Sequence, residues 1–205
     1  MLETLVDPPT DEYEAGTHTI VGALPANGEI RFETAASAVR CLTAAVSGTV
    51  GGLIHHKDVT IKSRTTYTNC RVEELGEPAA TVTTNHCEEW FEEAGDTGLN
   101  PEMPDAMHEA KFGFVATGRL LTCEIKIMRT GCEIKIMDGG NTSLPKATLE
   151  NISNASIIKA EMMVTGITYK GTGASCEPSE VNTHHDGVYK GTLEIKGNSS
   201  FARVN

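Results

Sequence analysis

The chain has 205 residues, a formal net charge of −11, twenty glycines and six cysteines. It contains no run of about 18 apolar residues, which excludes a transmembrane helix, and Met1-Leu2-Glu3 lacks the basic start and apolar core of a signal peptide. No basic patch interleaved with aromatic residues is present, so nucleic acid is not an expected partner.

Residues 1–16 form a polar, acidic segment interrupted by Pro8-Pro9. Such a polar tail is usually disordered in a lone domain, and contact with a neighbouring copy would order it. We therefore interpret this segment as an N-terminal arm that docks on a neighbouring copy. Its candidate contact residues are Leu2, Leu5, Val6 and Tyr13.

The rest of the chain alternates apolar and polar residues with a period of two, which predicts half-buried strands. Expected strands are 17–23, 29–34, 38–50, 58–69, 80–91, 111–117, the two halves of 121–137, 146–151, 156–170, 188–196 and a closing segment at 201–204. Pro25-Ala26-Asn27-Gly28 predicts a turn, and residues 92–109 read as an acidic loop, with a short helical turn near 104–110.

These elements predict an all-β fold, either an antiparallel β-sandwich or a Greek-key barrel of about twelve strands, braced by disulfides. We expect one β domain over residues 17–205, with the acidic loop at about 92–109 as an insertion.

The most regular stretch repeats Cys-Glu-Ile-Lys-Ile-Met at residues 123–128 and 132–137, with Arg129-Thr130-Gly131 between the copies. This pattern predicts a β-hairpin that folds about Thr130, with Cys132 near Met128. Cys123 and Cys132 then lie roughly 15 Å apart along the ladder at about 3.4 Å per residue. Each must therefore bond to another part of the fold, since a disulfide needs Cα atoms within about 7 Å.

Charge is unevenly distributed. Residues 1–20 hold five acids and residues 72–110 hold eleven, both without Lys or Arg, while the remainder carries 12 acids and 17 bases, a net of +5. Either these segments are solvated acidic loops, or the acidic segments of one copy meet the basic body of the next.

Cysteines on Thr-rich strands recur over roughly residues 28–197. The landmarks are Val39-Arg40-Cys41, Tyr67-Thr68-Asn69-Cys70, Cys87, Leu121-Thr122-Cys123, Cys132-Glu133-Ile134-Lys135-Ile136, Gly166-Ile167-Thr168-Tyr169, Cys176 and Gly187-Val188-Tyr189-Lys190-Gly191-Thr192. In style this chain resembles uncharacterised, secreted, Thr/Gly-rich six-cysteine β proteins of soil actinobacteria. The resemblance implies no activity and no functional residue, and the acidic N-terminus and the 92–109 loop depart from it.

Six cysteines allow fifteen pairings. Cys41 and Cys70 close a short loop between consecutive strands, and Cys87 and Cys123 flank the acidic loop, which leaves Cys132 with Cys176. Six cysteines in a β-rich chain also favour an oxidising location. We therefore expect an extracellular or cell-surface protein, either with a leader missing from this numbering or released and then oxidised, as a virion protein would be.

Evidence for chemistry in the sequence is sparse. His184-His185-Asp186, or His55-His56, would begin a metal site only with ligands from elsewhere, no C-x2-C pair suggests zinc, and the acids of 88–96 lack a calcium-loop spacing. No nucleophile motif or singled-out carboxylate pair is present. We expect no metal, no cofactor and no enzymatic activity.

We expect a non-enzymatic extracellular structural protein, a self-assembling homo-oligomeric subunit of a filament, surface layer or virion. The alternative is a glycan- or surface-binding β-sandwich module, in which Trp90 and Phe91 form the ligand face by stacking on a sugar. Alternation places Phe91 on the face of Cys87 and Trp90 on the other, so core packing is the favoured role of Phe91.

Overall fold

The computed structural model describes residues 18–35, 37–51, 60–73, 78–93, 108–117, 123–129, 131–137, 145–152, 157–174, 176 and 183–197. This part of the chain contains strands and no helix. The strands are β1 (His18–Ala23), β2 (Ile30–Glu33), β3 (Ala38–Gly51), β4 (Thr60–Val72), β5 (Ala79–Asn85), β6 (Cys87–Glu93), β7 (His108–Ala116), β8 (Glu124–Arg129), β9 (Cys132–Met137), β10 (Pro145–Ile152), β11 (Ile157–Thr172) and β12 (His184–Gly197).

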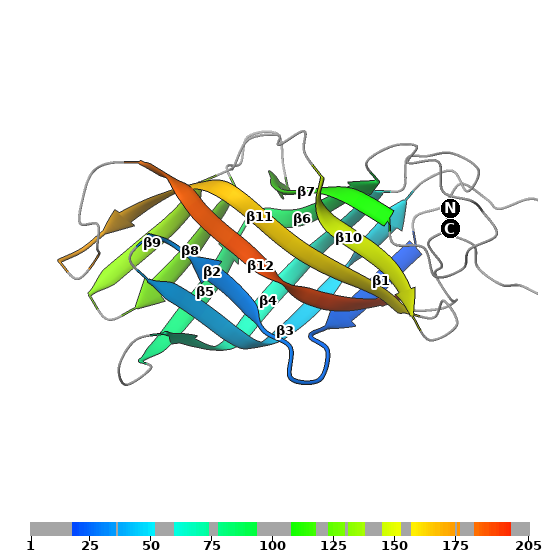
Figure 1. Ribbon diagram of the computed structural model, residues 1–205, viewed down its shortest axis with the longest axis horizontal. Helices are drawn as coiled ribbons and strands as arrows, with labels where there is room; N and C mark the ends of the chain where they lie inside the picture. The colour runs from blue at the N-terminus through cyan, green and yellow to red at the C-terminus, as the bar shows by residue number, and fades with distance from the viewer. Residues whose placement is uncertain are drawn as a thin grey trace, which may run out of the picture.

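The strands close into a barrel, in which every neighbouring pair is antiparallel (Figure 1). One ring of pairings runs β12-β2-β3-β4-β5-β8-β9-β11, and a second runs β12-β1-β3-β4-β6-β7-β10-β11. The long strands β3, β4, β11 and β12 belong to both rings. The other eight strands are short and combine in pairs, β1 with β2, β5 with β6, β7 with β8 and β9 with β10, so that each pair occupies one position in the wall. The four long strands and these four pairs form an eight-stranded, up-and-down barrel.

This closure corrects part of the predicted architecture. The all-β class, the antiparallel pairing and the disulfide bracing are confirmed, but the strands form one closed sheet rather than a two-sheet sandwich. Sequential segments lie next to each other around the ring, so the connections are not those of a Greek key.

The barrel core follows from the alternation in sequence. In β11 the inward positions Ile158, Ala160, Met162 and Val164 are buried, whereas their neighbours on the strand are exposed or half-buried. An eight-stranded barrel has an interior that side chains can fill. Aromatic and branched residues from all eight segments fill it here.

The inward alternation changes phase near the middle of several long segments. In β4 the buried residues run to Tyr67 and resume at Cys70, and in β11 they run to Val164 and resume at Ile167. Positive φ values mark these breaks, at Asn69 (52°) in β4 and Gly166 (72°) in β11. His86, with a φ of 54°, separates β5 from β6. One extra residue of this kind is a β-bulge, which bends a strand and reverses the face of every later side chain.

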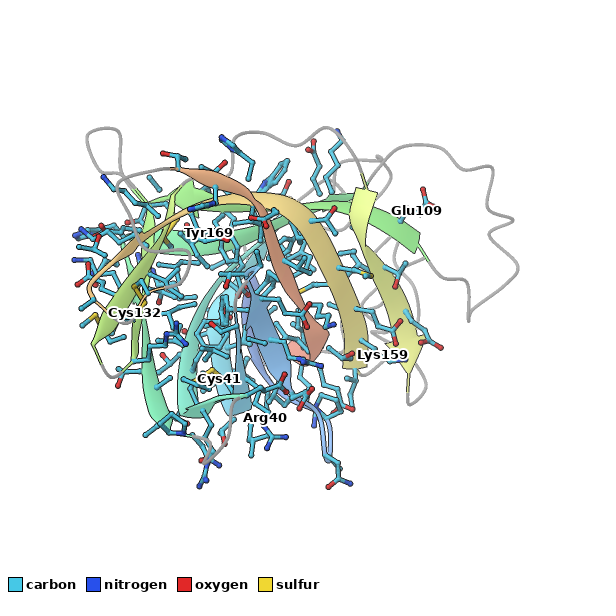
Figure 2. The ribbon with its side chains drawn as sticks, turned by 60° about the vertical axis from the view of Figure 1, so that its left-hand side comes forward. Arg40, Cys41, Glu109, Cys132, Lys159 and Tyr169 are labelled. Carbon is cyan, nitrogen blue, oxygen red and sulfur yellow. A yellow bond between two sulfur atoms is a disulfide. The ribbon has the colours of Figure 1, made fainter. Side chains whose placement is uncertain are left out.

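All three predicted disulfides are confirmed: Cys41–Cys70, Cys87–Cys123 and Cys132–Cys176. Cys41 and Cys70 are direct cross-strand partners on β3 and β4; Cys41 and Cys132 are labelled in Figure 2. Each bridge fastens neighbouring segments of the wall, and none of the three crosses the barrel.

The central hairpin is confirmed with a corrected register. Arg129 of β8 pairs with Cys132 of β9, so the register is shifted by one step from the predicted fold about Thr130. Gly131 has a φ of 71°, which a tight hairpin requires. The turn at 25–28 is also confirmed, with the Gly28 amide donating to the Pro25 carbonyl at 2.8 Å.

Three predicted elements lie outside the described residues. These are the N-terminal arm at 1–16, the closing segment at 201–204 and, apart from its flanks, the acidic loop at 92–109. The helical turn predicted near 104–110 is wrong where it can be seen, because 108–110 belong to strand β7.

Candidate functional site

Trp90 and Phe91, the predicted ligand face, lie on opposite sides of the barrel wall. Phe91 is 0% exposed and packs against Phe112, with ring centroids 4.9 Å apart. Trp90 is half-buried on the outer surface of β6. Successive residues of a strand point to opposite faces, so only Trp90 can contact a ligand at the surface.

Trp90 occupies the centre of an outer patch built from β4, β6 and β7. In register, Lys62 of β4 pairs with Trp90, and Trp90 pairs with Gly113 of β7. A Cβ added at Gly113 would meet nothing within 4 Å. On the β7 side, Trp90 therefore borders a residue without a side chain, and the space above that residue is open.

Charged side chains frame this Trp90 patch at both ends. Glu88 binds Arg64, with its Oε1 3.3 Å from the Arg64 Nε, and Glu92 binds Lys111, with its Oε2 3.5 Å from the Lys111 Nζ. An aromatic ring flanked by carboxylates and cations offers an apolar platform together with hydrogen-bonding groups. That combination suits a ligand with one apolar face and a polar rim, such as a pyranose ring.

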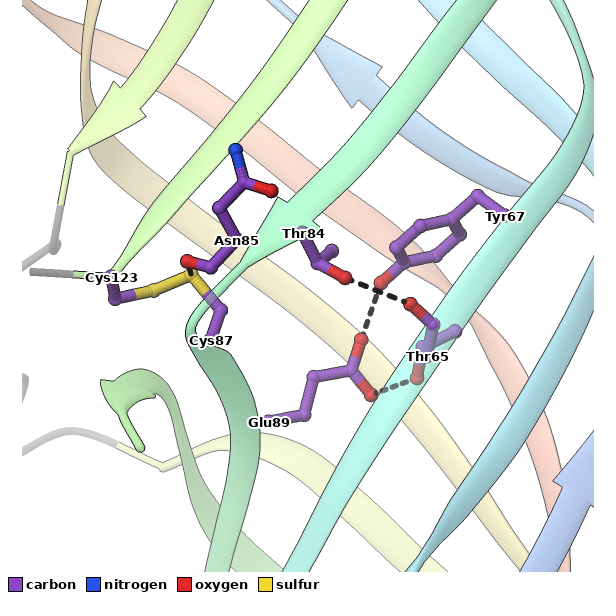
Figure 3. Close-up of a disulfide and its surroundings, with 7 residues drawn as sticks. All are labelled: Thr65, Tyr67, Thr84, Asn85, Cys87, Glu89 and Cys123. Carbon is purple, nitrogen blue, oxygen red and sulfur yellow. Dashed lines mark hydrogen bonds between the residues drawn. A yellow bond between two sulfur atoms is a disulfide. The ribbon is translucent and has the colours of Figure 1, made fainter. Parts of the chain in front are cut away.

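The residue between Glu88 and Trp90 points the other way. Glu89 is 3% exposed and lies inside the barrel, where four hydroxyl groups surround its carboxyl (Figure 3 shows two of them). Thr65 Oγ1 donates to Oε2 at 2.7 Å and Ser63 Oγ approaches the same oxygen at 3.4 Å. Tyr67 and Tyr189 donate to Oε1, the latter at 3.1 Å.

Burial raises the pKa of Glu89, and the hydroxyl hydrogen bonds oppose this rise only in part. The pKa values of Tyr67 and Tyr189 are raised well above the usual tyrosine value, first by burial and then by the charge of Glu89. Among the described residues no cation contacts the Glu89 carboxyl. The cluster is thus a buried acid satisfied by neutral hydroxyls.

Aromatic rings enclose the Glu89 cluster. Phe112 stacks on Tyr189 with centroids 5.4 Å apart, Phe114 contacts it edge-on at 5.3 Å, and Phe32 lies 5.0 Å away. A cavity of about 10 Å³ lies beside Phe32 and Tyr169, with room for no more than about one water. Glu89 lines neither this cavity nor the larger groove described below.

The wall beside this cluster is held by side chains. β4 pairs with β6 up to Ser63–Glu89 and with β5 from Cys70–Ala80, and no backbone ladder links the described residues 64–69 and 81–88. The Thr84 hydroxyl spans the interval by donating to the Thr65 carbonyl at 3.3 Å.

A larger groove, of about 650 Å³, lies across β2, β7, β10, β11 and β12. Its lining combines charged and polar residues with Ala147, Met162 and Met163, and apolar atoms supply most of its surface. Its cations are already paired: Glu33 binds both Lys190, at 2.7 Å, and Arg31, at 3.3 Å. No single ligand chemistry follows from this lining.

The histidine motif lies within strand β12 rather than in the predicted loop. His184 stacks on Tyr169 with centroids 5.2 Å apart, and His185 Nδ1 lies 3.0 Å from the Thr168 hydroxyl. Burial and Asp186 raise the pKa of Tyr169. The described residues contain no group of three His, Cys, Asp or Glu placed to hold a metal, and His55-His56 lies outside them.

Sequence reasoning missed the interior cluster although the signal was present. Glu89 alternates in phase with Cys87 and Phe91, and Tyr67 alternates in phase with Ile61 and Ser63. A charged residue in phase with apolar neighbours is the pattern that marks a buried acid.

The geometry defines a class: a disulfide-braced, eight-stranded antiparallel barrel with a packed interior. No family model matches the chain, and no curated protein and no solved structure matches it. Among the described residues there is no helix of the length and apolar character needed to cross a bilayer.

Proposed function

We propose that this protein is a non-enzymatic, extracellular structural subunit that assembles with copies of itself into a filament, surface layer or virion. The observation that carries the proposal is the packed interior, in which aromatic rings surround Glu89, the one buried carboxyl among the residues that the structure describes. Function is then a property of the outer surface.

The non-enzymatic part of the proposal rests on Glu89. An acid with a raised pKa is the usual mark of a catalytic site, but a general acid must come within hydrogen-bond reach of its substrate. At 3% exposure, with all its contacts made by the protein's own hydroxyls, Glu89 acts as a core residue.

The extracellular part of the proposal rests on the three disulfides, which are compatible with that location. Disulfides persist in oxidising compartments and are rare in the cytosol. The bridges join six buried cysteines in a chain with few aromatic residues to fill a core.

Closure of the barrel restricts how copies join. Each of the twelve described strands has at least two neighbours, so in this part of the chain no strand is free along a whole edge to accept a further strand. Assembly then relies on side chains of the outer face.

Deletion of residues 1–16 tests the arm. The truncated chain should remain a folded monomer with unchanged disulfides, while the full chain forms particles or fibres in electron micrographs. Assembly of the truncated chain to the same extent would remove the arm from the mechanism.

A second candidate function is glycan binding, favoured by the outer patch of Trp90 beside Gly113. On a glycan array, the wild-type chain should bind a defined set of sugars and Trp90→Ala should not. Equal signals from both proteins would exclude the patch.

A further inference from the structure

The outer face of β3 and β4 has a charge opposite to that of the chain as a whole. These strands hold four cations, Arg40, Lys62, Arg64 and Arg71, and no Asp or Glu, whereas the chain carries a net charge of −11. All four cations are on outward positions, and Figure 2 shows Arg40 projecting from the barrel. We call this surface the β3–β4 strip.

The register arranges the strip in rows across the two strands. Arg40 faces Arg71 at one end, and Thr49 faces Lys62 near the other. Between them lie hydroxyl rows, among which Thr43 faces Thr68. From Arg71 to Lys62 the strip is roughly 30 Å long, at about 3.4 Å per residue.

The cations of the strip differ in how far neighbouring residues neutralise them. Arg64 is neutralised by Glu88 at 3.3 Å. Lys62 and Arg71 are exposed and form no ion pair with any residue that the structure describes. The strip therefore offers cations and hydroxyl donors to an extended anionic partner.

The chain contains a segment of matching chemistry. Residues 1–14 hold five acids, Glu3, Asp7, Asp11, Glu12 and Glu14, and no Lys or Arg. Fully extended, the stretch from the first to the last of these acids spans about 36 Å at about 3.3 Å per residue, which is similar to the strip. We propose that the β3–β4 strip of one copy binds the acidic N-terminal segment of a second copy.

Strand direction favours a second copy over the same chain. β1 runs antiparallel to β3, with His18 opposite Val50 and Ala23 opposite Ala45. A straight continuation of β1 toward residue 1 passes beyond Gly51, away from Arg40 and Arg71. To reach its own strip the segment would have to reverse direction, which favours the strip of a second copy as its binding surface.

This inference rests on the proposed self-assembly and names the surface and the segment that carry it. Exposed charge pairs are individually weak and are screened by salt. Association is therefore expected to be strong only where many copies repeat the contact, and to fall as ionic strength rises.

The test uses paired charge reversals in the full chain, followed by sedimentation velocity. Lys62→Glu with Arg71→Glu should weaken self-association by about tenfold or more. The matched control, Lys170→Glu with Lys196→Glu, changes the same charge on β11 and β12, outside the strip, and should associate like the wild type. Circular dichroism melting of each variant verifies the fold.

Charge exchange makes the test specific. On its own, the double variant Asp7→Lys with Asp11→Lys should weaken association. Combined with the Lys62→Glu and Arg71→Glu reversals, it should restore association. If the strip reversal assembles as the control does, or if the combined variant gains nothing, the proposed contact is wrong even though the protein self-assembles. If the protein is monomeric at every concentration and the N-terminal segment still contacts the strip in a salt-dependent way, the segment binds its own chain and the proposal is overturned. A monomer without any such contact contradicts self-assembly itself.

Discussion

The hydroxyl oxygens of Tyr67 and Tyr189 lie 3.1 Å apart, and both converge on Oε1 of the buried Glu89. When Glu89 is ionised, both hydroxyls donate to it and the pair makes no bond of its own. When Glu89 is protonated, its own proton needs an acceptor and one tyrosine can donate to the other instead. The cluster therefore keeps its hydrogen bonds in either protonation state.

The stability of the fold should depend on pH through Glu89. Its pKa is raised in the folded state relative to the ordinary value of 4.5. Between these two pKa values the folded state keeps a proton that the unfolded state has released, so the free energy of unfolding falls as pH rises. Glu89→Gln should flatten this slope in urea unfolding measured at a series of pH values above 4.5. A slope unchanged by the substitution would assign the pH dependence to other groups.

The Cys41–Cys70 bridge should be a major stabilising element. It closes a loop with a sequence separation of 29, for which chain entropy gives about 3–4 kcal/mol. Replacing both cysteines with Ala should lower the free energy of unfolding by about that amount in urea titrations. A loss below about 1 kcal/mol would show that β3 and β4 hold each other without the bridge.

Substitution by Ala should change the stability of the barrel in different directions at Gly48 and at Gly113. A Cβ at Gly48 would lie 2.1 Å from the Lys62 carbonyl oxygen, which is backbone and cannot move aside. Gly48→Ala should destabilise the barrel by about 1–3 kcal/mol, whereas Gly113→Ala, which meets open space, should be neutral or slightly stabilising. Thermal melts of the two variants decide the matter, and equal behaviour would contradict the β3–β4 packing described above.

The Trp90 patch can be blocked without removing Trp90. Gly113→Val should fit the open space and place a branched side chain beside Trp90, so that glycan binding is lost while the melting temperature stays near the wild-type value. Phe91→Ala is the contrasting variant. It removes a core ring at 0% exposure and should cost about 3–5 kcal/mol.

Local patterns in the sequence were enough to predict most strands and the disulfides. Alternation with a period of two marked the buried positions of β8 and β9, and ladder geometry excluded the Cys123–Cys132 bridge. The remaining cysteines then paired as the spacing of their strands suggested.

Barrel closure could not be predicted in the same way. The pairing of β12 with β1 and β2 joins residues near opposite ends of the chain, and no local pattern encodes it. The phase changes at Asn69, His86 and Gly166 were also hidden, because a bulge is set by backbone conformation rather than by residue type. The phase change at His86 divides the expected strand at 80–91 into β5 and β6.

The central claim is that the outer surface of this barrel joins copies of the chain. The most direct test is the mass of the full chain by light scattering, at roughly 50 mM and roughly 500 mM salt. The account predicts multiples of 21.9 kDa at low salt, decreasing toward the monomer at high salt. A mass of 21.9 kDa at both salt concentrations and at every protein concentration tested would contradict it.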